Sequence, residues 1–585
     1  MAEERIGSIL LADCGTVMTK AVLLEQVAGQ YRFVARAEAP TTTEDPWNDV
    51  TEGIRQAVEQ ISRVTGRRFF DVGGNLMSPE VAGRQGVDAF AVLASASEPL
   101  EVVLGGLVRD LSVASAERAA AGTYSLVKAI LTRDGKKMPT EADHVRTIRD
   151  TAPDAICIAG GIDGGATAPV LELVKSIALA CSMMDPSARP RLLYAGNAQL
   201  RERVVKVVQG QTDLRVADNV RPILTKENLL GAQAELDTFY IQNKMGLLPG
   251  VDLVSKWSSL PLTPTARAFG RLVQYLWHLG DRSKGVLGVD VGAANTTLVA
   301  VFDGRAFLTI LGGLGSAFGG RRLLQKRGGA EVITRWLPEP MSEDEALGML
   351  INREMRPTSI QQDLRELRLE HALTREVIRA ALEIARPGWE PSAAQPYPHL
   401  LPLCDTIIVS GGILAHAPHP GQVALVVLDA LEPIGVTTLV LDVYEIAPAL
   451  GGVAAIKPLA AVETLDNEAL VNLATVVTPV GRARRGDMVL RVKVTYDDGS
   501  NFNVEVRYGD LEVLPLPPGR EAVLELHPLR RFDVGLGGPG KAGKRRVSGG
   551  LAGLIVDARG RPLRFARKPE LRQDQMRQWL WDVGG

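Results

Sequence analysis

Two stretches of the chain share one hydrophobic pattern: an apolar run, a short turn with aspartate and glycine, and a second apolar run. The first is SILLADCGTVMTKAVLLE at residues 8–25, and the second is GVLGVDVGAANTTLVAVFDG at residues 285–304. Apolar runs on both sides of a glycine turn predict a β-hairpin. When the two turns are aligned, three pairs of residues coincide, namely Asp13 with Asp290, Gly15 with Gly292 and Lys20 with Thr297.

The pattern after each hairpin repeats as well. A third strand is predicted at 31–36 and again at 306–311, and each is followed by helical spacing of apolar residues. A short buried strand then ends in a glycine turn, GGIDGG after 155–159 and SGGILAHA after 406–409. Each half is therefore predicted to run β-β-β-α-β-α-β-α, as in an internally duplicated α/β protein.

Domain boundaries follow from this repeat. The first half is predicted at 1–225 with an insertion at about 68–140, and the second at 285–462 with an insertion at about 327–400. A helical connector at 226–284 joins them. Beyond 475 the chain alternates apolar and polar residues around the turn YDDGSN, which predicts a β-rich accessory domain at 475–585 that ends in a helix.

Composition narrows the classes of protein. The 585 residues carry a formal charge of −2, so no basic excess favours nucleic acid, and the run KAGKRR at 541–546 is interpreted as a solvated loop. No apolar run reaches the roughly 18 residues that cross a bilayer. The four cysteines lack CxxC spacing and the first residues lack an apolar signal segment. We therefore expect a cytoplasmic protein that binds neither nucleic acid nor membrane.

The first turn, DCGTVMTK, carries the residue types that bind a metal–phosphate group. Gly15 allows the backbone a tight turn whose N–H groups can contact phosphate oxygens. Thr16 and Thr19 add hydroxyl donors, and Lys20 can neutralise a phosphate. Asp13, at the end of the strand, is positioned to hold Mg²⁺ through water.

The second turn, DVGAANTT, supplies the same elements from the other half of the chain. The matching residues are Asp290, Gly292, Asn295, Thr296 and Thr297. One such turn is as consistent with a plain hairpin as with a binding site. Two opposed copies favour a shared site for a triphosphate and its metal, because paired amide turns and paired carboxylates suit that ligand.

The later glycine turns are interpreted differently from each other. Gly411 and Gly412, after the buried strand of the second half, would let an adenine or ribose lie on the backbone. GGIDGG is the expected counterpart in the first half and is interpreted as structural, since a short glycine motif by itself is weak evidence for a ligand.

These motifs resemble those of a known family. The stretches ADCGTVMTKAVLL, TTTEDP, AGGIDGG, VADNVRP, GVLGVDVGAANTTLVAVFDG and SGGILAHA are similar to the glutamate-mutase-associated MutL family, also called GlmL, which is distinct from mismatch-repair MutL. That family falls within the actin-like, sugar-kinase and DnaK-type ATPase superfamily. The resemblance implies an α/β fold of two RNase H-like halves closing on Mg-ATP, followed here by the β-rich C-terminal domain.

The resemblance also implies roles and partners. Asp13 and Asp290 would be the metal-side aspartates, and Gly411 and Gly412 would form the adenosine turn. Family members are associated with cobalamin-dependent mutases, so the implied function is a chaperone-like or reactivating partner with slow ATPase activity. A small-molecule kinase, with Asp163 as a candidate base, and a nucleotide-binding scaffold or filament protein remain alternatives. The catalytic base and the oligomeric state are not predicted.

Overall fold

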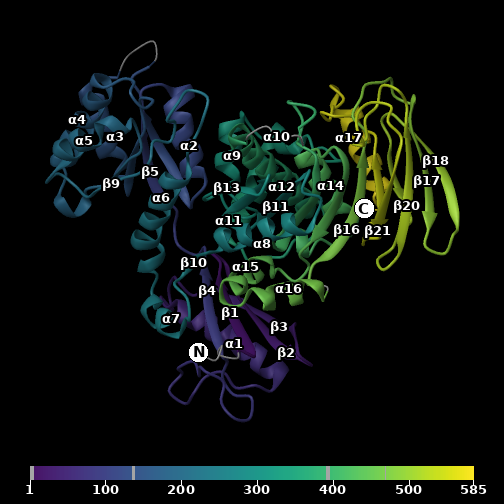
Figure 1. Cartoon of the computed structure of the whole chain (residues 1–585), viewed down its shortest axis with the longest axis horizontal. Helices are drawn as coiled ribbons and strands as arrows, with labels where there is room; N and C mark the ends of the chain where they lie inside the picture. The colour runs from purple at the N-terminus through teal and green to yellow at the C-terminus, as the bar shows by residue number, and fades with distance from the viewer. Residues whose placement is uncertain (1–5, 135–138, 390–394, 468, 585) are drawn as a thin grey trace.

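The computed structural model describes residues 6–134, 139–389, 395–467 and 469–584 (Figure 1). Within these ranges the strands form four sheets. Two sheets carry the predicted hairpins, at the bottom and the centre of Figure 1, and a third forms the lobe at the upper left. The fourth lies at the right, close to the C-terminus. None of the helices in the described residues has the length and apolar character that a membrane crossing requires.

The sheet of the first half begins with an antiparallel ribbon of three strands, β1 (Ser8–Cys14), β2 (Met18–Val27) and β3 (Gln30–Pro40). On the other side of β1, β4 (Ala89–Ala94) and then β10 (Thr263–Pro264) are added in parallel. The helix α1 (Val50–Thr65) covers β2 and β3 with a buried apolar stripe. Its N-cap is Asp49, whose side chain accepts a hydrogen bond from the Thr51 N–H.

The sheet of the second half has the same plan. Its ribbon consists of β11 (Gly285–Val291), β12 (Thr296–Phe302) and β13 (Arg305–Leu311), and β14 (Cys404–Ser410) and β15 (Gly435–Leu441) follow in parallel beside β11. Numbered within each half, both sheets have the strand order 3-2-1-4-5. The predicted duplication of an RNase H-like unit is therefore confirmed.

One strand assignment was wrong. The fourth strand of the first sheet is β4, within the stretch predicted as an insertion, whereas the predicted strand at 155–158 lies in a different sheet. Both segments are short, apolar and buried, so their pattern alone could not decide which one pairs with β1. The counterpart of the Gly411–Gly412 turn is consequently the end of β4 at Ala94–Ser95, and not GGIDGG.

A parallel sheet occupies the chain between β4 and β10. Its order is β6-β5-β7-β8-β9, a doubly wound arrangement, with strands β5 (Leu100–Gly105), β6 (Ser125–Leu131), β7 (Ala155–Ile158), β8 (Arg191–Tyr194) and β9 (Leu214–Val216). The helices of this lobe and its connection are α2 (Ala114–Ala121), α3 (Glu141–Thr151), α4 (Ala168–Ser182), α5 (Arg201–Val208), α6 (Leu230–Asn243) and α7 (Val251–Trp257).

Two helices join the halves by crossing between them. The helix α8 (Thr265–Leu279) follows the last strand of the first half but packs on the ribbon of the second. Conversely, α15 (Ala447–Ile456) follows β15 and packs on β1 and β4. The two helices meet at Gly451, where a Cβ would lie 1.8 Å from the Ala268 carbonyl oxygen. Through this close contact α8 and α15 pack directly against each other where the two halves meet.

The remaining helices belong to the second half. Four of them precede β14, namely α9 (Gly320–Arg327), α10 (Glu331–Thr334), α11 (Glu343–Met355) and α12 (Leu364–Ala385). Three others are α13 (Gly412–Ala415), α14 (Pro420–Leu431) and α16 (Pro458–Asp466). The longest of the seven, α12, packs on β12 and β13, so this segment covers the face of the sheet that α8 leaves free.

The C-terminal region is β-rich, as predicted, but it shares a sheet with the second half. Three strands extend that sheet beyond β15, in the order β16 (Val471–Thr478), β22 (Leu554–Asp557) and β19 (Leu511–Leu514). A separate four-stranded sheet contains β18 (Asn501–Arg507), β17 (Met488–Tyr496), β20 (Glu521–Pro528) and β21 (Gly543–Ser548). The predicted terminal helix is α17 (Pro569–Asp582), which packs on α14.

Buried ion pairs attach this region to the second half. The guanidinium group of Arg559 donates to Asp429 at 2.8 Å and to Asp557 at 2.9 Å, and all three side chains are almost fully buried. Arg375 on α12 donates to the same Asp429. Because an unpaired buried charge is costly, removing the C-terminal region would leave Asp429 with one cation fewer in an apolar core.

Candidate functional site

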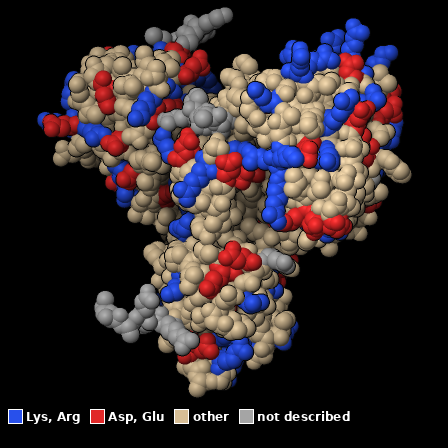
Figure 2. Space-filling model, turned by 45° about the vertical axis from the view of Figure 1, so that its right-hand side comes forward, with Lys and Arg blue, Asp and Glu red and all other residues tan. Residues whose placement is uncertain are grey.

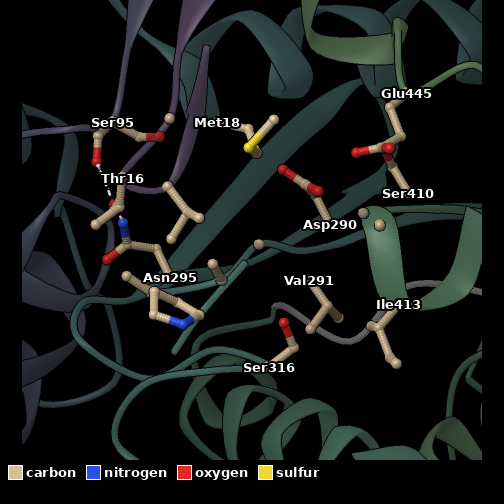
Figure 3. Close-up of a pocket in the computed structure, with 18 of the residues that line it drawn as sticks. Thr16, Met18, Ser95, Asp290, Val291, Asn295, Ser316, Ser410, Ile413 and Glu445 are labelled. Atoms are coloured by element: carbon tan, nitrogen blue, oxygen red, sulfur yellow. Dashed lines mark hydrogen bonds between the residues drawn. The ribbon is translucent and has the colours of Figure 1, made fainter. Parts of the chain in front are cut away.

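The two hairpin turns face one cavity of about 490 Å³ between the halves of the molecule. Both Asp13 and Asp290 line this cavity, so the two aspartates that the sequence aligns are brought together. In Figure 3 the carboxylate of Asp290 points into the cavity, with Glu445 and Ser410 on one side and Asn295 and Thr16 on the other. The lining comes from the ends of β1, β11 and β14 and from the segment after β15.

Ten of the twelve predicted binding residues line the cavity, namely Asp13, Gly15, Thr16, Lys20, Asp290, Gly292, Asn295, Thr297, Gly411 and Gly412. The other two do not. Thr19 is fully buried and its hydroxyl bonds that of Thr41, and the hydroxyl of Thr296 donates to the Leu314 carbonyl. Both hydroxyls are thus used by the protein itself, because successive side chains of a strand point to opposite faces.

The first turn is closed by backbone and side-chain bonds. The Gly15 N–H donates to the Met18 carbonyl at 3.0 Å, and a Cβ at Gly15 would lie 2.8 Å from that oxygen, so the turn requires glycine. The Thr16 hydroxyl donates to the Ser95 carbonyl at 3.1 Å, which ties the turn to the end of β4 (Figure 3). The position of the turn is therefore set by its own sheet.

The second turn is held by the glycine-rich loop that follows β13. The Gly292 N–H donates to the Asn295 carbonyl at 2.9 Å, and the Ser316 N–H of the following loop donates to the Gly292 carbonyl at 2.9 Å. The side-chain oxygen of Asn295 accepts from the Gly313 N–H. A Cβ at Gly315 would lie 2.4 Å from the Gly292 carbonyl, so the loop GGLGSAFGG can approach the turn only with glycine at that position.

Both turns leave backbone donors open. The N–H groups of Thr16 and Val17 in the first turn, and of Ala293 and Ala294 in the second, make no hydrogen bond to any of the described residues. All four residues line the cavity. Unpaired amides that converge on one space form a concavity for anionic oxygens. The arrangement therefore places unpaired N–H donors from both hairpin turns at the cavity.

The two aspartates differ in their surroundings. The Asp13 carboxylate accepts a hydrogen bond from the Thr265 hydroxyl at 2.7 Å, whereas Asp290 accepts none from a described residue. Burial raises the pKa of Asp13, and Lys20 and Thr265 partly offset this effect. Burial also raises the pKa of Asp290, to about 7, with Lys20 opposing the shift and the charge of Asp13 adding to it. Asp290 is thus a half-buried carboxylate that accepts no hydrogen bond from a described residue.

One side chain on the second half binds three cationic or basic groups. Glu445 follows β15, and its carboxylate accepts from the Lys20 ammonium, from Arg36 at 3.2 Å and from the His416 ring at 2.8 Å. Burial opposes ionisation of Glu445, but Lys20 and the hydrogen bonds outweigh it and hold its pKa well below the usual range. Lys20 and Arg36 lie on β2 and β3, so these bonds cross the cavity from one half to the other.

Sequence reasoning missed Glu445, although a signal was present. The segment LDVYE follows a buried strand, and polar residues at the carboxyl end of a parallel strand commonly face a binding site. In the same segment Asp442 accepts from the Ser410 hydroxyl and from two N–H groups at the start of α15. Asp442 therefore connects Ser410, at the end of β14, to α15, one of the two helices that join the halves.

Gly411 and Gly412, which follow β14, differ in whether the fold requires a glycine. Gly411 has a φ of +103° and a Cβ there would lie 2.2 Å from the Val291 carbonyl, so the fold itself requires it. A Cβ at Gly412 would meet nothing closer than 3.8 Å, the distance to a Glu445 oxygen. The protein does not need glycine at 412, and the space beside it is open to a ligand.

A segment of the second half closes the outer side of the cavity. The residues 357–361, between α11 and α12, line it together with Arg353. Arg353 is held in place by Glu370 at 3.2 Å. This wall lies on the same half as Gly412, so the cavity has one end between the two turns and a second end enclosed by the second half.

Other predicted or candidate residues lie elsewhere. Asp163, the candidate base of the kinase alternative, does not line the cavity, since its carboxylate accepts from the Ala198 N–H and the Asn219 side chain in the parallel sheet lobe. GGIDGG and VADNVRP meet each other there rather than at the cavity. The structure therefore offers no support for Asp163 as a base.

The donor set fits a magnesium–nucleotide complex. The described residues contain no group of three or more His, Cys, Asp or Glu side chains that could hold a metal alone. Mg²⁺ typically keeps several waters and is held by one or two carboxylates together with substrate phosphates. Asp13, the unpartnered Asp290 and the open amides of the turns match that requirement.

The fold and this cavity define an actin-like protein, in which two RNase H-like halves meet at one cleft. A family model described as MutL protein matches residues 9–469, which is well over half of the chain. The chain therefore belongs to the MutL family, as its motifs predict. It is 23% identical over 448 residues to Protein MutL from Clostridium tetanomorphum, covering 72% of this chain and 88% of that protein.

Solved structures give weaker likenesses. Acetone carboxylase in its nucleotide-free form is 9% identical, with 86% of this chain and 81% of that chain covered and a TM-score of 0.31. Gluconate kinase from Lactobacillus acidophilus is 9% identical, with 80% and 92% covered and a TM-score of 0.29. The actin-like fold of this chain is defined by the strand order 3-2-1-4-5 that its two halves have in common.

Proposed function

We propose that the protein binds ATP with Mg²⁺ in the cavity between its halves and hydrolyses it slowly. The observation that carries this proposal is that two copies of one Asp-Gly turn open onto a single space, with unpaired amides on both sides. A triphosphate bound there would receive hydrogen bonds from both halves at once. Its charge would be balanced by Mg²⁺ and by Lys20.

The aspartates would bind the metal side of this complex. Mg²⁺, when bound, would neutralise phosphate charge and draw electron density from the phosphorus that water attacks. Asp13 and Asp290 would hold the waters of the ion, and Asp290 has the greater need of a cation because it has no hydrogen-bond donor. Ser316 and Thr297 line the same wall and would contact phosphate oxygens.

The nucleoside would lie toward the second half. Gly412 leaves open space beside the backbone, and the segment 357–361 with Arg353 encloses that end of the cavity. The guanidinium group of Arg353 can stack on a purine or bond a ribose oxygen. This placement puts the triphosphate between the hairpins and the base between Gly412 and the segment before α12.

We further propose that nucleotide binding serves a chaperone-like or reactivating role toward a cobalamin-dependent mutase. Membership of the MutL family supports this proposal. Nucleotide binding would act on the partner through a hinge motion between the halves, which are joined by α8 and α15. The parallel sheet lobe extends from the first half (Figure 1). A change in the angle between the halves would move this lobe relative to the C-terminal sheets.

A calorimetric titration with ATP, with and without Mg²⁺, tests the nucleotide proposal. We expect one site per chain, with binding strengthened by Mg²⁺ and strongly weakened in Asp290→Asn. Asp163→Asn is the matched control, because Asp163 lies outside the cavity and should leave the affinity unchanged. Failure of the wild-type protein to bind any nucleotide would refute the proposal.

The partner role needs a separate experiment. A cobalamin-dependent mutase that has been inactivated by turnover would be mixed with the protein and ATP, and both phosphate release and recovered mutase activity would be measured. We expect the inactivated mutase to stimulate the ATPase and to regain activity, with Asp290→Asn as the negative control. Nucleotide binding without any response to a mutase would refute the partner role alone.

A further inference from the structure

The ammonium group of Lys20, which we propose binds a phosphate, already forms an ion pair with Glu445. Lys20 lies opposite Asp13 in the hairpin, where its charge can reach the cavity, yet its Nζ donates to Glu445 on the other half. The side chain of Glu445 is only 5% exposed, and that of Lys20 is 22% exposed. A phosphate in the cavity would therefore meet a lysine that a buried carboxylate holds.

Glu445 keeps an unusual backbone conformation at this position. Its φ is +50°, in the left-handed region that non-glycine residues rarely adopt. Such a conformation persists only where the surroundings hold it, and it is common at functional sites. Here the bonds that the Glu445 carboxylate accepts from Lys20, Arg36 and His416 hold the residue in place. The carboxylate of Glu445, and not its backbone, makes these bonds.

The charges around Glu445 show what would happen when a phosphate enters. Asp13, Asp290 and Asp442 lie close enough to add negative charge, while Lys20, Arg36 and His416 are the facing basic groups. Arg36 has a second carboxylate partner in Glu38 at 2.6 Å, and His416 is largely exposed. Lys20 is therefore the cation of this group that a phosphate between the turns can take over.

We propose that Glu445 is a positioning residue that competes with the nucleotide phosphate for Lys20. In the nucleotide-free protein Glu445 holds the ammonium group at the cleft and thereby bonds the two halves. Phosphate binding draws Lys20 away, and Glu445 keeps Arg36 and His416. Each binding event thus exchanges a bond between the halves for a bond to the nucleotide. The proposal rests on the proposed nucleotide site.

The alternative is a purely structural ion pair. In that case removing Glu445 would loosen the cleft, disturb the position of Lys20 and weaken nucleotide binding. The competition model predicts the opposite sign, because removal of the carboxylate frees the ammonium and takes away a negative charge that repels phosphate. The direction of the change in affinity therefore separates the two models.

The test compares Glu445→Gln with a matched control, Glu25→Gln. Glu25 is a buried glutamate on the same strand as Lys20, paired with Arg67 and Arg84 away from the cavity. Calorimetry with Mg-ATP should give an affinity about tenfold higher in Glu445→Gln, the effect expected from releasing one partly buried ion pair. Glu25→Gln should match the wild type. The gain should disappear when Lys20→Met is added to Glu445→Gln.

A second measurement does not depend on nucleotide. The rate of acylation of Lys20 by a small amine-reactive reagent, followed by peptide mass spectrometry, reports whether its ammonium is held. Without nucleotide we expect Lys20 to react several-fold faster in Glu445→Gln than in the wild type, and ATP to protect it again. Equal reactivity in the two proteins, or weaker ATP binding in Glu445→Gln, would overturn the competition model.

The two proposals fail in different ways. If the wild type bound no nucleotide but Lys20 became reactive in Glu445→Gln, the proposed function would be wrong and the ion pair would remain as a contact between the halves. If the wild type bound Mg-ATP and Glu445→Gln bound it no better, the proposed function would stand and the competition model would be wrong.

Discussion

The two hairpins of this protein have one backbone plan and different electrostatics. Asp13 and Asp290 occupy equivalent strand ends, and each is followed by a glycine turn. The residue opposite Asp13 in the hairpin is Lys20, whereas the residue opposite Asp290 is Thr297. One copy therefore carries its own cation and a hydroxyl donor from Thr265, and the other carries neither.

This difference shows how two copies of one motif can take different roles in a single binding site. In the proposed site the first hairpin would supply positive charge to the phosphate, and the second would supply to the metal a carboxylate that has no hydrogen-bond donor. The raised pKa of Asp290, about 7, is the electrostatic consequence of burial without a partner. Perturbed carboxylates of this kind mark functional sites more often than structural ones.

The largest effect is expected from Asp290→Asn. Loss of the unpartnered carboxylate should weaken Mg-ATP binding by about 100-fold, the upper end of the effect expected from altered metal-site groups. Calorimetry at pH 8 measures it, and Asp163→Asn serves as the control. An effect equal to that of the control would remove Asp290 from the site.

The same substitution should act on stability in the opposite direction. A raised native pKa means that the folded protein holds a proton which the unfolded chain releases near pH 4. The contribution of Asp290 to stability is therefore complete at low pH and falls as the pH rises from about 4 to 7. At pH 8 the nucleotide-free Asp290→Asn protein should melt at a higher temperature than the wild type, as scanning calorimetry can show. A lower melting temperature would contradict the raised pKa.

The pH dependence of binding sharpens the comparison further. Because Asp290 must lose its proton to face a cation, the affinity for Mg-ATP should fall by about tenfold in total between pH 8 and pH 6, a range that spans its pKa of about 7. Titrations at pH 6, 7 and 8 measure this slope, and it should vanish in Asp290→Asn. An equal slope in wild type and variant would assign the titration to the nucleotide or to another group.

A smaller effect is expected from Asp13→Asn. Its carboxylate is already bonded by Thr265 and lies beside Lys20, so its loss should cost about tenfold in affinity for Mg-ATP. The measurement is the same titration, with Thr265→Val as a companion variant. A loss greater than that of Asp290→Asn would reverse the assignment of the two hairpins.

The smallest effect separates neighbouring threonines of the second hairpin. Thr297 lines the cavity, while the hydroxyl of Thr296 donates to the Leu314 carbonyl. Thr297→Val should weaken Mg-ATP binding by about threefold, the value of a modest hydrogen bond. Thr296→Val should leave binding unchanged and lower the melting temperature, since it leaves a buried carbonyl without its donor. Equal effects on binding would contradict the placement of these side chains.

Much of the fold and the site could be predicted from the sequence. The hairpins, the duplication and ten of the twelve predicted residues that line the cavity follow from a pattern that is local and repeated. The exclusion of Thr19 and Thr296 depends on which face of a strand is buried, and here both faces are buried, so alternation did not decide it.

Other features depend on pairing at long range. The choice of β4 rather than β7 as the neighbour of β1 is made by tertiary packing, because both are short apolar strands. Glu445 meets Lys20 over a separation of 425 residues, and no local pattern records that contact. Likewise, the C-terminal strands join the sheet of the second half through β16, a connection that alternation of polar and apolar residues does not reveal.

A double-mutant cycle on Asp13 and Asp290 tests most directly whether the two turns serve one ligand. Mg-ATP affinity would be measured by calorimetry for the wild type, Asp13→Asn, Asp290→Asn and the double variant. We predict one site per chain and a double-variant loss smaller than the sum of the single losses by at least about 1 kcal/mol, as for residues that share a partner. Two sites per chain, or strictly additive losses, would contradict a single nucleotide held between the two hairpins.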